Sequence, residues 1–156
     1  MMILQIYTHI PDILQPCIDS VKRYADRKNA EYIAIEKEKD STYYHVEAWA
    51  DKIQLEYEAT NDYLLYADWD IMLCKDFDVG GDEPLFGDQH TNLVWTGARS
   101  NIFKAILDEY IKFEKSNINA KKARYRIWKM FNKNPIVKNK FNPNTYNHLM
   151  YSKGRS

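Results

Sequence analysis

The sequence lacks the features that would place the protein in a membrane or outside the cell. No apolar run approaches the roughly 20 residues that cross a bilayer. The first residues, MMILQIYTHI, have neither the positive stretch nor the small-residue cleavage site of a secretion signal. The two cysteines, Cys17 and Cys74, form no CxxC pattern. We therefore expect a cytoplasmic protein with reduced thiols and no transmembrane segment.

Acidic residues are missing from the last part of the chain. All 22 of them lie between Asp12 and Glu114, although the formal net charge is zero. An acidic body therefore carries a basic C-terminal segment, which either pairs with that body within one fold or faces an anionic partner. From residue 115 onward every charged residue is basic: Lys115, Lys121, Lys122, Arg124, Arg126, Lys129, Lys133, Lys138, Lys140, Lys153 and Arg155.

The first half of the chain alternates between strand and helix patterns. Residues 2–8, 32–35 and 63–73 are apolar and strand-like. Between them, residues 13–25 and 43–60 carry apolar side chains at the spacing of one helical face. A β-α-β-α-β order predicts a parallel sheet flanked by helices, and a chain of 156 residues is long enough for one such domain with a core.

The second half is less regular. Two glycines, an aspartate and a proline predict a loop at 80–84, and residues 92–96 resemble a strand. Helical spacing recurs over 102–111 and in a basic stretch, 120–131. Residues 132–156 are rich in Asn, Pro and Lys, so we expect a loop there. Neither a repeat nor a linker divides the chain, which predicts a single domain over residues 1–156.

Two aspartates interrupt the apolar stretch YLLYADWDIML. On a strand, Asp68 and Asp70 project from the same face and Trp69 from the other. They come near the carboxyl end of the third predicted strand, where open α/β sheets bind their ligands. Adjacent carboxylates repel, and oxygen ligands suit Mg²⁺ or Mn²⁺. The pattern therefore favours a divalent-cation site.

An Asp-x-Asp triplet is short and also occurs by chance. The chain has a second one at residues 76–78, in a polar stretch where a solvated loop explains it better. A calcium-binding EF-hand beginning at Asp68 is excluded, because Leu73 stands where that loop needs Gly and Val79 where it needs Glu. The strand-end position is what favours metal binding by the first triplet over surface decoration.

The stretch AWADKIQLEYEATNDYLLYADWDIML resembles a block of the GT-A glycosyltransferases, especially of their retaining families. In that block, an Asp or Ser followed by Arg or Lys opens a helix that leads into a strand ending in a DXD motif. Asp51 and Lys52 match the helix, and Asp68 and Asp70 match the motif. The stretch NLVWTGARSNIFKAILDEYIKF resembles the strand and helix that follow, on the acceptor side.

The end of the chain, FNPNTYNHLMYSKG, is similar to the closing segment of these families. There a histidine supplies a third metal ligand, and a glycine and a lysine reach the diphosphate. His148, Lys153 and Gly154 are the matching residues, although their order and spacing depart from the family pattern. An ordinary surface histidine is the competing interpretation for His148.

The resemblance implies a GT-A-like, Rossmann-type α/β sandwich with a mostly parallel sheet. It implies a metal-dependent enzyme that transfers a sugar, with retention, from a UDP- or GDP-sugar to a glycan or a lipid-linked acceptor. Mn²⁺ or Mg²⁺ is the implied cofactor. Residues 1–78 would form the nucleotide-sugar-binding half, and residues 79–156 the acceptor-side half with the basic segment.

The same resemblance implies roles for individual residues. Asp68, Asp70 and His148 would form the metal site, with Asp70 bound directly and Asp68 at the ribose or a metal-bound water. The remaining donor-side residues also have a competing interpretation, as ordinary residues at a strand end or on a helix surface. These are Tyr7 and Thr8 beside the nucleoside, Asp51 and Lys52 holding the donor, and Lys153 at the diphosphate.

Asp88 and Asn92 are the acceptor-side candidates. They flank a polar loop that precedes a predicted strand, as binding loops do, although an ordinary connection explains it equally well. An inverting transferase needs a carboxylate base to activate the acceptor hydroxyl, and Asp88 is the catalytic candidate for it. The resemblance favours retention, for which no dedicated base is evident.

Aromatic residues interleave with the basic ones in the C-terminal segment. This segment either closes over the acidic donor site, or lies on an anionic membrane surface that carries a lipid-linked acceptor, or binds nucleic acid. The first alternative is preferred, because the two aspartates need no nucleic acid to explain them. Two other functions remain open. One is a nucleotidyltransferase, although residues 7–11 do not form the Gly-rich phosphate loop expected after the first strand. The other is a non-catalytic basic binding module.

Overall fold

The fold is built on one mixed β-sheet. The computed structural model describes residues 1–7, 12–36, 43–89, 92–98 and 101–149. The sheet has five strands in the order β2-β1-β3-β6-β5. Strand β1 pairs in parallel with both β2 and β3, whereas β6 is antiparallel to both β3 and β5. Four strands therefore share one direction, which confirms the predicted α/β fold with a mostly parallel sheet. The strands span β1 Met2–Tyr7, β2 Glu31–Glu36, β3 Leu64–Ala67, β5 Leu85–Phe86 and β6 Leu93–Trp95.

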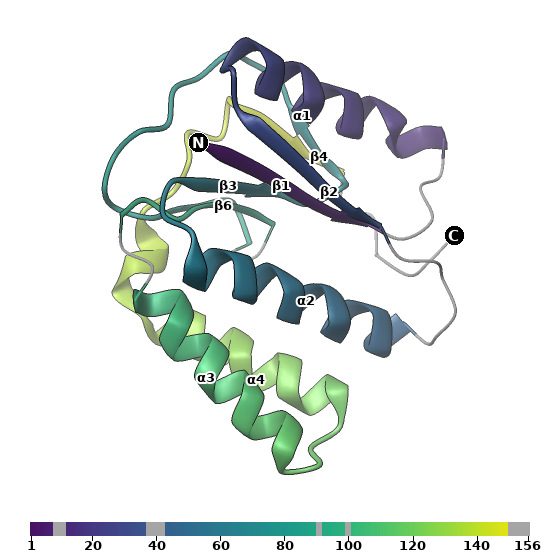
Figure 1. Ribbon diagram of the computed structural model, residues 1–156, viewed down its shortest axis with the longest axis vertical. Coiled ribbons are helices and arrows are strands. Elements are labelled where there is room, and N and C mark those ends of the chain that lie inside the picture. The colour runs from purple at the N-terminus through teal and green to yellow at the C-terminus, as the bar shows by residue number, and fades with distance from the viewer. Residues whose placement is uncertain (8–11, 37–42, 90–91, 99–100, 150–156) are drawn as a thin grey trace.

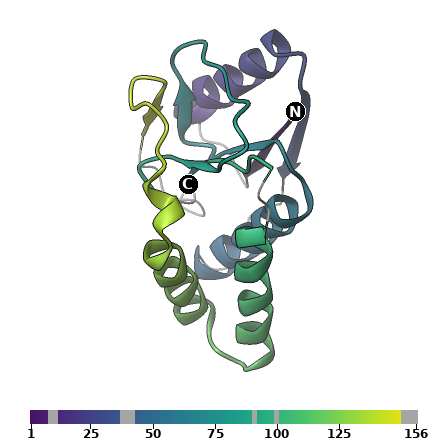
Figure 2. The same ribbon diagram turned by 90° about the vertical axis from the view of Figure 1, so that its left-hand side faces the viewer.

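Helices cover both faces of this sheet (Figures 1 and 2). A short 3-10 turn, Asp12–Leu14, leads into α1, Gln15–Arg27, on one face. The other face is covered by α2, Tyr43–Thr60, and then by α3, Asn101–Lys115, and α4, Ala120–Lys133. All four helices fall where the apolar spacing of the sequence predicts them.

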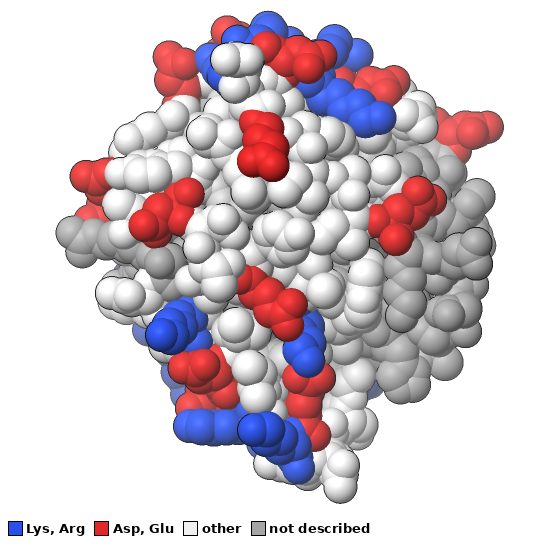
Figure 3. All heavy atoms as spheres, viewed as in Figure 1, with Lys and Arg blue, Asp and Glu red and all other residues white. Residues whose placement is uncertain are grey.

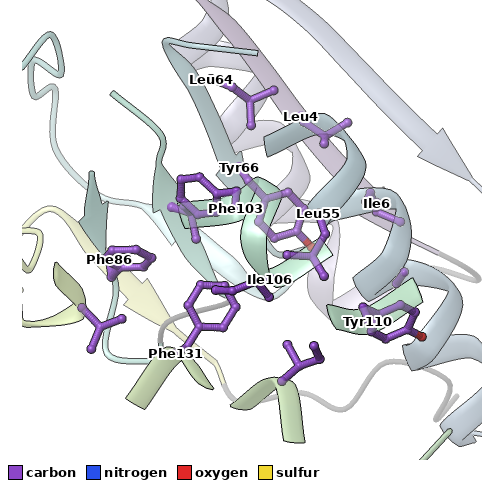
Figure 4. Packing of buried hydrophobic residues seen from close by; sticks show 14 of the residues in the cluster. Leu4, Ile6, Leu55, Leu64, Tyr66, Phe86, Phe103, Ile106, Tyr110 and Phe131 are labelled. Atoms are coloured by element: carbon purple, nitrogen blue, oxygen red, sulfur yellow. The ribbon is translucent and has the colours of Figure 1, made fainter. Parts of the chain in front are cut away.

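The two faces of β1 show why helices pack on both sides. Ile3 belongs to the cluster under α1, whereas Leu4 and Ile6 belong to the larger cluster shared with α2, α3 and α4. Figure 4 shows this larger cluster, in which Tyr66 and Phe131 come from the sheet and from α4 respectively. Alternating side chains of one strand thus fill two separate cores.

The predicted third strand, 63–73, is wrong in its second half. Strand β3 ends at Ala67, and the amide of Ile71 donates to the carbonyl of Asp68 at 3.1 Å, which closes a turn. The chain then leaves the sheet as β4, Ile71–Leu73, and pairs antiparallel with β7, Tyr146–His148. Asp68 and Asp70 therefore do not share one strand face, because a turn separates them.

A loop was predicted for residues 132–156, of which 150–156 lie outside the described residues. The described part, residues 132–149, is more ordered than predicted. It contains a 3-10 helix, Pro135–Lys138, and β7. Residues 139–149, named here the strap, run along the outer edge of β5: Phe86 donates to Asn139 at 2.8 Å, and Phe141 donates back to Phe86 at 2.9 Å. The Phe141 side chain is buried in the core under α1. The strap thereby carries β7 to β4.

Candidate functional site

Polar residues converge at the carboxyl edge of the sheet, where β3 and β5 end and β6 begins. Because β6 is antiparallel, its first residues lie at the same edge as the last residues of β3. The amide of Asp68 donates to the carbonyl of Asn92 at 2.8 Å, and the amide of Gly87 donates to Leu93 at 2.7 Å. The end of β3 is therefore fixed beside the facing ends of β5 and β6.

His148 arrives at this edge on β7 and connects two of the aspartates. In the β4–β7 ladder it lies opposite Ile71, the residue after Asp70. Its Nε2 lies 3.2 Å from Asp70 Oδ2, and its Nδ1 lies 3.1 Å from Asp88 Oδ2. The side chain of His148 is only 9% exposed. The imidazole thus bridges two carboxylates with its two nitrogens.

Asp70 is the most deeply buried carboxylate of this cluster. Its side chain is 3% exposed, and its Oδ1 atom has no hydrogen-bond partner among the described residues. A buried carboxylate oxygen without a donor is unfavourable, and it often marks the place of an ion or a water molecule. Asp70 therefore has a free ligand atom next to the imidazole of His148.

Asp88 is held in place from several sides. Asn92 donates its amide to Asp88 Oδ1 at 2.5 Å, and the backbone amide of Asp88 donates to the hydroxyl of Tyr146 at 2.7 Å. Gly87 makes this possible, because a Cβ atom there would lie 2.5 Å from Asn92 Oδ1. The absence of a side chain at position 87 leaves room for the buried amide of Asn92.

The charges of the cluster are coupled. Burial lowers the pKa of His148, but the hydrogen bonds and charges of Asp70 and Asp88 outweigh this and raise it to about 9. Burial raises the pKa of Asp88, but its hydrogen bonds with Asn92 and His148 lower it overall. A pKa near 9 favours the imidazolium form of His148 at neutral pH in the metal-free protein, and a cation bound at Nε2 would have to displace that proton.

Asp68 and Tyr7 lie at the same edge. Asp68 is half-buried, and its Oδ1 accepts a hydrogen bond from the hydroxyl of Tyr66. Tyr7, the last residue of β1, packs against a small cluster that includes Trp69. Its pKa is raised by burial and by the nearby charge of Glu36. Both residues are positioned where a ligand over the edge of the sheet would meet them.

Asp51 and Lys52 lie elsewhere, in the helical layer. Asp51 accepts from Arg124 of α4 at 2.7 Å, and Lys52 pairs with Glu114 of α3 at 3.1 Å. The structure does not join them to the cluster around His148. Thr8, Lys153 and Gly154 lie outside the described residues. The donor-binding roles of these five residues stay predictions.

The cluster offers an incomplete set of protein ligands to a metal ion. Within the described part of the chain, no group of three or more His, Cys, Asp or Glu side chains is arranged to hold one. Two ligands do fit, since two adjacent ligands about 2.1 Å from an octahedral ion lie about 3 Å apart. The separation between His148 Nε2 and Asp70 Oδ2 is 3.2 Å. An ion held here would take its remaining ligands from substrate and water.

Sequence reasoning missed two contributors, Tyr146 and Gly87. Tyr146 and His148 alternate on β7, so their side chains share one face. This Tyr-x-His spacing is the signal that could have marked the segment as a strand. Nothing in the sequence around Gly87 shows that Asn92 approaches it, because that contact spans the antiparallel pairing of β5 and β6.

Comparison with known proteins gives little beyond the geometry. No protein-family model matches the chain, and no curated protein matches it. Among solved structures, it is similar to a glycosyltransferase involved in the glycosylation of the major capsid of PBCV-1, with 12% sequence identity and a TM-score of 0.42. The match covers 69% of this chain and 66% of that one, slightly less than two thirds of its length. A likeness this distant says nothing about chemistry.

Proposed function

We propose that the protein is a glycosyltransferase that binds a nucleotide-diphosphate sugar and a divalent cation at the carboxyl edge of its sheet. The observation that carries this proposal is the buried Asp70, whose Oδ1 has no partner among the described residues and whose Oδ2 lies 3.2 Å from His148 Nε2. Ligands of open α/β sheets bind at this edge.

Asp70 and His148 would hold the cation, Mn²⁺ or Mg²⁺. Such ions are commonly bound through one or two carboxylates together with substrate phosphates and water, so two protein ligands are sufficient. A cation bound there would stabilise the negative charge of the departing diphosphate as a Lewis acid. Asp68, half-buried at the end of β3, would meet the ribose or a metal-bound water.

Asp88 would act through His148. A histidine that binds a metal usually donates its other ring N–H to a carboxylate, which fixes the tautomer and the ring orientation. Asp88 Oδ2 lies 3.1 Å from Nδ1, so Nε2 is left facing Asp70. The lowered pKa of Asp88 keeps it ionised for this role, whereas a general base works best with a pKa near the operating pH. We therefore assign Asp88 a positioning role, in keeping with a retaining transferase.

The remaining parts of the proposal concern the substrates. Tyr7 and Thr8 would lie beside the nucleoside, and Lys153 would reach the diphosphate of a UDP- or GDP-sugar. Asn92 would line the acceptor side, where a glycan or a lipid-linked acceptor would enter. Asp51 and Lys52 are left out of this site, because their charged groups pair with Arg124 and Glu114.

Thermal unfolding with nucleotide and metal tests the proposal. The melting temperature of the wild type is measured with UDP or GDP, each with and without Mn²⁺. A ligand at about 100 times its Kd stabilises the native state by about 2.7 kcal/mol, which raises Tm by roughly 5–10 °C in a domain of this size. We expect a shift that needs both nucleotide and metal, and that is lost in Asp70→Asn.

The second Asp-x-Asp triplet supplies a matched control. Asp78 has the same spacing in sequence but forms an exposed ion pair with Lys28 at 2.7 Å. Asp78→Asn removes the same charge and should keep the full nucleotide-dependent and metal-dependent shift. Equal shifts in the wild type and Asp70→Asn, or no shift with either nucleotide, would contradict the proposal.

A further inference from the structure

The outer face of α4 carries cations and aromatic rings together. Tyr125 is 60% exposed and Trp128 is 43% exposed. With a helical period of 3.6, they share one side of the helix with several exposed basic residues. This set is named the α4 face and consists of Lys121, Lys122, Tyr125, Arg126, Trp128, Lys129 and Lys133.

The opposite side of α4 holds the helix firmly on the molecule. Ala123, Ile127 and Phe131 are buried in the main core. Arg124 bonds to Glu47 and Asp51 of α2. Apolar packing and ion pairs thus fix the inner side of α4, and the α4 face turns outward. At its edge, Arg126 lies over the ring of Phe113 of α3, 5.2 Å from the centroid.

The α4 face has no acidic residue of its own helix to balance it, since the last acidic residue of the chain is Glu114. The α2–α3 side differs, because Figure 3 shows acidic and basic side chains interspersed there. On that side Lys112 pairs with Glu109 at 3.0 Å, and Lys52 with Glu114 at 3.1 Å. On the α4 face, Lys129 instead lies over the ring of Tyr125, 4.9 Å from its centroid.

The shape of this face decides between anionic partners. Helix α4 lies at the outside of the molecule, so its exposed side faces outward (Figure 2). Single-stranded nucleic acid is held in a basic groove that follows its backbone, which the outward side of one helix does not form by itself. A bilayer surface is flat, attracts clustered lysines to anionic headgroups, and takes up Tyr and Trp at its polar boundary.

From these observations we infer that the α4 face docks the protein on the surface of an anionic lipid bilayer. The contact is peripheral: the aromatic rings enter the headgroup region, and the lysines remain beside the lipid phosphates. This inference does not depend on the proposed function, because it uses none of the residues of the site around His148.

Sedimentation with lipid vesicles tests it. The full chain should bind mixed phosphatidylcholine–phosphatidylglycerol vesicles and not vesicles of phosphatidylcholine alone, and binding should weaken as salt rises above about 0.15 M. Each surface lysine contributes about fivefold to the partition coefficient. The double variant Lys122→Gln with Lys129→Gln should therefore bind about 30-fold more weakly.

A matched control removes the same number of positive charges from other surfaces of the protein. Lys22→Gln with Lys104→Gln alters exposed lysines of α1 and α3, and it should bind as the wild type does. Trp128 gives an independent readout, because it is the most exposed of the four tryptophans: Trp69 and Trp95 are buried, and Trp49 of α2 is partly buried. Brominated lipids should quench tryptophan fluorescence in the wild type, and Trp128→Phe should lose most of that quenching.

Four results would overturn the inference. The first three are equal binding to both kinds of vesicle, equal weakening in the two double variants, and lipid quenching that persists in Trp128→Phe. The fourth is release of the protein from anionic vesicles by single-stranded RNA, when the RNA supplies fewer phosphate groups than the lipid does. The last of these would assign the α4 face to nucleic acid.

Discussion

At the scale of single residues, the site depends on one imidazole that two carboxylates share. His148 reaches Asp70 with Nε2 and Asp88 with Nδ1, at 3.2 and 3.1 Å. The resemblance put Asp70 and His148 at one site, and a single polar loop suggested Asp88 and Asn92. The contact of His148 with Asp88 that joins the two pairs was not predictable, because it depends on how β7 and the ends of β5 and β6 lie in the fold.

The raised pKa of His148 predicts how the stability of the metal-free protein varies with pH. The ordinary pKa is 6.5 and the folded one is about 9, so the stabilisation is complete below pH 6.5 and is lost as pH rises through 9. Over this range we expect the free energy of unfolding of the wild type to fall by about 2 kcal/mol relative to that of His148→Gln. This figure is reduced because solvent screens the interaction with the half-exposed Asp88.

Urea denaturation in the presence of a chelator, repeated across that pH range, measures this difference. The His148→Gln variant is the reference for the wild type, because glutamine has a similar size and position 148 then carries no titrating group. A difference between the two proteins that stays constant from neutral to alkaline pH would contradict the assignment of the imidazolium.

At the scale of elements, α2 shows how a sequence pattern can be structurally right and functionally ambiguous. The apolar spacing over 43–60 predicts this helix, and its bounds are confirmed as Tyr43–Thr60. The Asp-Lys pair within it resembles a donor-binding motif, yet both side chains pair with neighbouring helices. Spacing along one helix determines its buried face, whereas the partners of its charged residues depend on how helices pack.

The ion pairs that α2 makes with α4 and with α3 should differ in their effect on stability. Arg124 is 27% exposed and bonds to Glu47 and Asp51, which are 8% and 17% exposed. Arg124→Met removes the cation that both largely buried carboxylates face, so we expect a loss of about 3 kcal/mol in the free energy of unfolding. Chemical denaturation measures it.

Lys52→Met is the matched control for this prediction. The pair of Lys52 with Glu114 is 39% and 41% exposed, and an exposed pair of this kind contributes under about 1 kcal/mol. If both variants lost the same stability, the α2–α4 contact would not be the stronger one. The same Lys52 variant, measured with UDP and Mn²⁺, tests whether this lysine holds the donor.

At the scale of the whole molecule, the strap joins the core to the site. Phe141 is 5% exposed, and its ring meets that of Phe77 edge to face at 6.1 Å. A few residues later the same segment forms β7 and brings His148 to Asp70. Packing under α1 and the geometry of the site are therefore coupled through one short segment.

Phe141→Ala should loosen the strap. Removing a buried ring costs about 3 kcal/mol. The displaced strap should also weaken nucleotide binding with Mn²⁺, although Phe141 is not among the residues proposed to bind nucleotide or metal. Urea denaturation and a nucleotide titration measure the two effects. Tyr125→Ala removes an exposed ring and should change stability by less than about 0.5 kcal/mol. Unchanged nucleotide binding in Phe141→Ala would show that the site is independent of the strap.

By itself, the sequence determined the helices, the parallel strands and the class of fold. Periodic burial is local information, because the identity of each residue selects the face that it turns to the core. Only the tertiary structure decided that the third strand breaks at Asp68, that β6 runs antiparallel, and that the basic end of the chain forms a second small sheet. The turn closed by Ile71 is local, but the pairings on either side of it join distant segments. Strand β3 pairs with β6 before the turn and β4 pairs with β7 after it, so the course of the chain depends on where those other segments lie.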